Sequence, residues 1–66
     1  MNIKFNTVLN DKGNPIAYDI TGTIMVDGEI TPLGYSCFYF ENAFKELCYW
    51  VNECPSATVT YTASRA

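Results

Sequence analysis

The sequence predicts a single α+β domain, a two-layer sandwich in which one helix covers one face of a four-stranded, mainly antiparallel sheet, in the order β-β-β-α-β. Three observations predict this fold. Residues 2–10, 16–26 and 57–64 alternate apolar and polar side chains, with the period of two that a half-buried strand has. Residues 42–54 change to the period of an amphipathic helix. Asp27-Gly28 lies between two alternating runs and favours a tight hairpin turn. The chain of 66 residues has the length of one domain, covering 1–66.

The first two strands are separated by a cluster of turn-forming residues at 10–15. The first strand places Ile3, Phe5 and Leu9 on one side. The apolar side of the second strand consists of its even-numbered residues, and Gly22 interrupts that side. A glycine inside a strand predicts a bulge or a close approach of another group to the backbone.

A type I′ turn at Asp27-Gly28 predicts the register of the second and third strands. Val26 then pairs with Glu29, and further pairs follow: Ile24 with Thr31, Ile20 with Tyr35, Tyr18 with Cys37 and Ile16 with Tyr39. In this register Phe38 and Phe40 point away from the core. A bulge at Pro32 or Gly34 would exchange the two faces and bury both phenylalanines. The sequence leaves both interpretations open.

The helix over residues 42–54 is predicted to bury Phe44, Leu47, Cys48 and Val51, which recur at i, i+3, i+4 and i+7. Ala43, Trp50 and Cys54 flank that stripe. Asn42 is the expected N-cap, and Pro55 ends the helix. The fourth strand, residues 57–64, has a threonine-lined outer side. Because a helix connects it to the third strand, it can run parallel to a neighbour, for which the first strand is a candidate.

Charge and residue usage exclude several functions. The formal net charge is −3, and the four basic residues are scattered, which disfavours direct binding of nucleic acid. The chain has no histidine, the commonest general base, and no glycine-rich phosphate loop. We therefore expect no enzymatic activity, catalytic residue, cofactor or metal. The three cysteines are an odd number, and we expect reduced, mostly buried thiols in a cytoplasmic protein that does not cross a membrane.

A single helix covers only one face of a sheet, so the other face meets solvent or a partner. The expected register places Met25 and Phe38 on that uncovered face, where they form an apolar patch with Phe40 if both phenylalanines are exposed. Tyr49 on the polar side of the helix is a further candidate anchor. The candidate partner-binding residues are Met25, Phe38, Phe40, Tyr49, Thr58, Thr60 and Thr62. The sheet edge offered by residues 57–64 also allows strand addition, including homodimerisation.

The segment FENAFKELCYWVNEC, followed by the closing strand SATVTYTAS, completes a short acidic chain that resembles small bacteriophage-encoded host inhibitors of the anti-CRISPR type. The resemblance covers the whole chain as a pattern of elements, and no functional residue is carried over from it. It implies a non-enzymatic protein, in the cytoplasm of the host cell, that binds a host defence protein and occludes its working surface. Two alternatives stay open: an antitoxin-like or nucleic-acid-associated regulatory subunit, and a self-associating structural or assembly protein.

Overall fold

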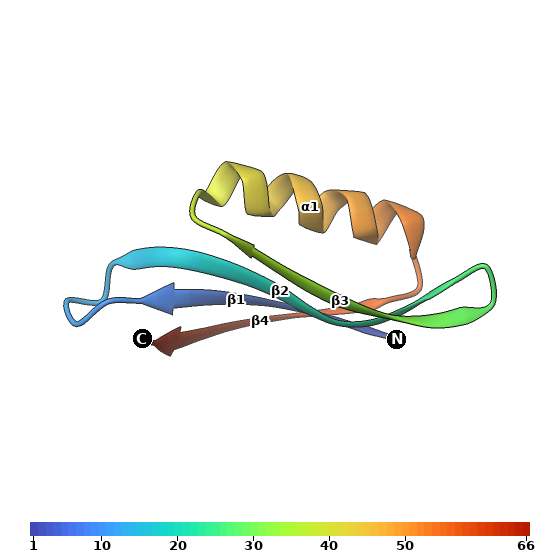
Figure 1. Cartoon of the computed structure of the whole chain (residues 1–66), viewed down its shortest axis with the longest axis horizontal. Coiled ribbons are helices and arrows are strands. Elements are labelled where there is room, and N and C mark those ends of the chain that lie inside the picture. Colours follow the sequence, from blue (N-terminus) through green and yellow to red (C-terminus); the bar gives the residue numbers. More distant parts are fainter.

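A computed structural model describes all residues, 1–66, and contains the five predicted elements in the predicted order. The elements are β1 (Asn2–Leu9), β2 (Pro15–Val26), β3 (Glu29–Cys37), α1 (Phe40–Glu53) and β4 (Thr58–Arg65). The strands form one sheet in the order β3-β2-β1-β4, in which β4 runs parallel to β1 and the other pairs are antiparallel. Figure 1 shows α1 as a second layer on one side of this sheet. The predicted α+β fold is confirmed.

The β2–β3 hairpin has the predicted register over most of its length. Val26 pairs with Glu29 and the ladder continues without a bulge to Tyr18 opposite Cys37. Asp27 and Gly28 have φ angles of 52° and 81°, the positive values that a type I′ turn requires at both central positions. The predicted pair of Ile16 with Tyr39 is wrong, because β3 ends at Cys37 and the chain leaves the sheet there.

Gly22 marks a close approach of two backbones, as its position in the strand predicts. It lies opposite Ile3 on β1 and has a φ of +131°. A Cβ atom at this position would collide with the Asn2 carbonyl oxygen and lie 3.2 Å from the Ile3 Cα. Only glycine therefore lets β1 pair this closely with β2 at the start of β1.

The core lies between α1 and the sheet and contains eight buried residues. The sheet contributes Ile3, Phe5, Ile20, Ile24 and Leu33, the helix contributes Ala43 and Leu47, and Cys54 follows the helix. All three cysteines are free thiols, but Cys37 is only half-buried and Cys48 is exposed, so the expectation of mostly buried thiols holds for Cys54 alone.

The helix is turned away from the orientation that its apolar pattern predicts. Ala43, Leu47 and the half-buried Trp50 face the sheet, whereas Phe44, Cys48 and Val51 are exposed. The indole of Trp50 packs against the ring of Tyr35 on β3, with ring centroids 6.1 Å apart. This contact places the helix toward the β3 side of the sheet and leaves its other apolar flank open. The predicted buried stripe is thus wrong for three of its four residues.

The helix also begins earlier than predicted. Its N-cap is Tyr39, which makes no side-chain capping bond, and not Asn42, which lies inside the first turn. The early start brings Phe40 into the helix, where its ring lies 5.6 Å from the ring of Tyr18 on β2. The helix thus begins without a side-chain cap, and its first residue is held by aromatic contacts.

The sheet is larger than the helix that covers it. The 14 residues of α1 span about 21 Å, whereas the 12 residues of β2 span about 40 Å. The helix lies over β2 and β3, and β4 lies at the far edge of the sheet (Figure 1). The result is an elongated molecule of 42 × 18 × 15 Å in which Val59 on β4 packs against the core while Tyr61, on the same side of β4, stays exposed.

Candidate protein-binding surface

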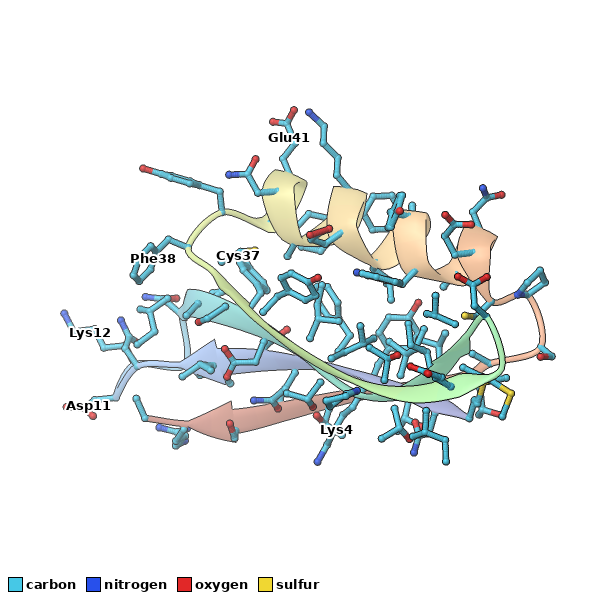
Figure 2. The ribbon with its side chains drawn as sticks, turned by 45° about the vertical axis from the view of Figure 1, so that its right-hand side comes forward. Lys4, Asp11, Lys12, Cys37, Phe38 and Glu41 are labelled. Carbon is cyan, nitrogen blue, oxygen red and sulfur yellow. The ribbon has the colours of Figure 1, made fainter.

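On β1 and β4, the sheet face opposite the helix is polar. Lys4 points away from α1 on this side (Figure 2). The Thr62 hydroxyl donates a hydrogen bond to Asn6 Oδ1 at 2.8 Å, and Asn6 Nδ2 donates to the Ser64 hydroxyl at 2.9 Å. These hydrogen bonds link the side chains of Asn6, Thr62 and Ser64 to one another across β1 and β4. Thr58 and Thr60 lie on the same face, opposite Asn2 and Lys4.

The expected apolar patch of Met25, Phe38 and Phe40 does not form on that face. Phe38 lies in the connection between β3 and α1, is 78% exposed and points outward at the end of the molecule (Figure 2). Phe40 is the first helical residue, and Met25 lies at the opposite end of β2, beside the hairpin turn. The bulge that would have buried both phenylalanines is absent. Both phenylalanines are exposed, as the first interpretation expects, but β3 ends before it reaches either of them, so neither lies on the uncovered sheet face.

The exposed aromatic side chains instead gather on the helix side. The ring of Phe40 stacks on that of Phe44 at 5.7 Å and meets the edge of Phe5 at 6.2 Å. The ring of Tyr61 on β4 lies 6.0 Å from the same Phe5 ring. Phe5 is buried and belongs to the core. The core is therefore continuous with an aromatic surface that reaches from the start of α1 to β4.

Next to these rings, a shallow, open hollow of about 470 Å³ lies between α1 and β4. We name it the α1–β4 groove, defined by Phe44, Leu47, Cys48, Val51, Asn52, Pro55 and Tyr61. Phe44 is 48% exposed and Tyr61 is 69% exposed, while Leu47 lies buried. No charged residue lines the groove. It is thus an apolar surface with two aromatic side chains available for contact.

A second hollow, of about 460 Å³, lies where the end of α1 meets the hairpin. It brings together Met25 and Tyr49, two of the predicted candidates, with Trp50, Asp27 and Glu53. A hydrogen bond to the Glu53 carboxylate, together with the charge of that carboxylate, raises the pKa of Tyr49. The Trp50 indole N–H is buried without a hydrogen-bond partner. This hollow is lined by two acidic residues, Asp27 and Glu53, whereas the α1–β4 groove has no charged residue.

Sequence reasoning missed the groove for a specific reason. The alternation of residues 57–64 places Tyr61 on the side of the apolar residues, and that placement is correct. The period of the helix places Phe44 and Val51 on its apolar side. It does not predict that the helix lies toward β3. The groove exists because the apolar side chains of Phe44 and Val51 on α1 and of Tyr61 on β4 border a gap that the helix does not close.

Comparisons with protein-family models, with curated proteins and with solved structures give no match to this chain. The helix is too short and too polar to cross a bilayer. Three or more His, Cys, Asp or Glu side chains nowhere gather in a way that could hold a metal ion.

Proposed function

We propose that this chain is a small, non-enzymatic protein-binding module that receives an apolar segment of a partner protein in the α1–β4 groove. The observation that carries the proposal is the continuity of the groove with the exposed aromatic surface of α1. Aromatic residues in a desolvated pocket are the usual anchors of protein interfaces.

The energy available at this surface fits a protein partner. Full burial of a Phe side chain contributes roughly 1.5–3 kcal/mol, so covering the exposed half of Phe44 contributes about 1 kcal/mol. Tyr61 has more exposed surface and a hydroxyl that a partner can hydrogen-bond. The uncharged lining costs a partner little desolvation of ionic groups. An apolar side chain inserted between Phe44 and Tyr61 would bury both rings.

The finer proposal concerns what binding achieves. As the resemblance to phage-encoded inhibitors implies, the module acts by occluding the working surface of a host defence protein. Its 42 Å length supports this, because a module anchored at the groove extends well beyond the anchor and excludes other molecules from the partner's surface.

The experiment is affinity capture from bacterial lysate with three forms of the protein: wild type, Phe44→Glu and Ile30→Glu. Both replaced side chains are apolar and exposed, but Ile30 lies on the hairpin outside the groove. We expect a stoichiometric partner with wild type and Ile30→Glu, and its loss with Phe44→Glu while circular dichroism shows the native fold. Recovery of no stoichiometric partner, or equal recovery with Phe44→Glu, would refute the proposal.

A further inference from the structure

We propose that the outer edge of β4 pairs with β4 of a second copy of this chain, giving a two-fold symmetric dimer with one continuous sheet. This goes beyond the proposed groove function, because the contact is made by backbone groups at the sheet edge and does not depend on any partner protein.

The backbone of β4 has a free side. Its ladder joins it to β1 alone, from Asn2 opposite Thr58 to Leu9 opposite Arg65. The Thr58 N–H donates to the Met1 carbonyl oxygen at 3.1 Å, and the Ala66 N–H donates to the Leu9 carbonyl oxygen at 2.9 Å. Since backbone groups alternate sides along a strand, the even-numbered residues of β4 face β1. The N–H and C=O groups of Val59, Tyr61 and Ala63 therefore point outward, where a further strand can pair with them.

The two edges of the sheet differ in protection. Edge strands are commonly protected by proline, charge or a bulge. On β3, Pro32 lies opposite Thr23, between two hydrogen-bonded pairs of the hairpin, so its nitrogen faces outward and has no hydrogen to donate. On β4 there is no proline, no register shift and no charged side chain before Arg65. The β4 edge is therefore the one that is open to strand addition.

A second copy offers the strand that this edge fits. Paired residues in an antiparallel ladder share a sheet face. If the two strands cross at Tyr61, Val59 of each copy lies opposite Ala63 of the other, and threonine lies opposite threonine on the other face. Apolar side chains thus meet apolar ones and hydroxyls meet hydroxyls. No acidic residue lies on β4, so the net charge of −3 on each copy does not place like charges at the contact.

The extent of exposed surface supports a dimer. The molecule exposes 4528 Å², against about 4,200 Å² expected for a compact monomer of this mass. Oligomerisation is one of the ways in which domains this small gain stability, and here all three cysteines are free. The two-fold axis of this pairing is perpendicular to the sheet, so both helices lie on the same side of it. The two grooves then flank the paired Tyr61 side chains.

The test measures mass and amide exchange on the purified protein, without any partner. Sedimentation equilibrium at two concentrations should give twice the chain mass of 7.4 kDa. The outward amides of Val59, Tyr61 and Ala63 should exchange slowly with solvent. The variant Ala63→Lys places a charge at the edge and should weaken dimerisation at least tenfold, whereas Ile30→Lys on β3 should not.

A mass of 7.4 kDa at millimolar concentration would overturn the proposal. So would a dimer whose outward β4 amides exchange rapidly, or one that survives Ala63→Lys and is lost in Ile30→Lys. The exchange measurement uses the wild-type chain, so it decides the question even if a variant fails to fold. Loss of partner capture in Phe44→Glu with an intact dimer would separate the groove from the edge.

Discussion

Replacing Gly22 by alanine tests the packing of β1 against β2 most directly. At φ +131° an L-residue is strained by roughly 1–3 kcal/mol. The added Cβ also collides with the Asn2 carbonyl oxygen, so the start of β1 must move away from β2. Partial loss of the burial of Ile3, which is fully buried, adds about 1–2 kcal/mol. We therefore expect Gly22→Ala to destabilise the fold by about 2–5 kcal/mol.

That loss is large for a chain of this length. At about 0.05–0.15 kcal/mol per residue, the whole domain has a free energy of unfolding of roughly 3–10 kcal/mol. Urea unfolding followed by the fluorescence of Trp50, the sole tryptophan, measures the change.

The matched control is Gly34→Ala on β3. Its φ is not positive, and a Cβ there meets no atom within 4 Å. We expect a free energy of unfolding within about 0.5 kcal/mol of wild type or slightly higher. If Gly22→Ala also stayed within about 1 kcal/mol of wild type, the close approach of β1 to Gly22 would be refuted.

Two further predictions concern the aromatic surface and the acidic hollow. Phe40→Ser should lower the free energy of unfolding by about 1–2 kcal/mol, because its ring contacts Phe5 and Tyr18, whereas Phe38→Ser should change it by less than about 0.5 kcal/mol. Equal effects in urea unfolding would contradict the placement of the two rings. Glu53→Gln should lower the pKa of Tyr49 toward 10.0, measured by ultraviolet titration. Because the folded pKa of Tyr49 is raised, its contribution to stability is present below pH 10.0 and is lost as the pH rises through the folded value. An unchanged Tyr49 titration in Glu53→Gln would exclude this pair.

The sequence predicted those features that local chemistry determines. Asp27-Gly28 specified the turn and, through it, the register down to Tyr18 opposite Cys37. Alternation located β1, β2 and β4, the hairpin turn located β3, and the change of period located the helix to within two residues at its start. Gly22 predicted a bulge or a close approach, and the structure has the close approach. In each case a few neighbouring residues carry the information.

The features that the sequence did not predict depend on contacts between distant segments. The apolar residues of the helix form one broad stripe with Trp50 at one border and Cys48 at the other, so periodicity alone does not decide which flank of that stripe is buried. The structure buries the flank that carries Ala43, Leu47 and Trp50, and the contact of Trp50 with Tyr35 joins α1 to β3 across the layers. The position of Phe38 and Phe40 depends on where β3 ends. Alternation could not locate that end, because residues 37–40 are apolar without a polar residue between them.

The elongated form of the molecule affects how its assembly must be measured. With a Cα radius of gyration of 12.3 Å, against about 10.8 Å for a compact domain of this length, a lone chain diffuses more slowly than a sphere of its mass. On gel filtration it would elute early and resemble a larger species. A column calibrated with round standards would thus overstate the size of a solitary molecule, and only methods that weigh the particle directly distinguish one chain from two.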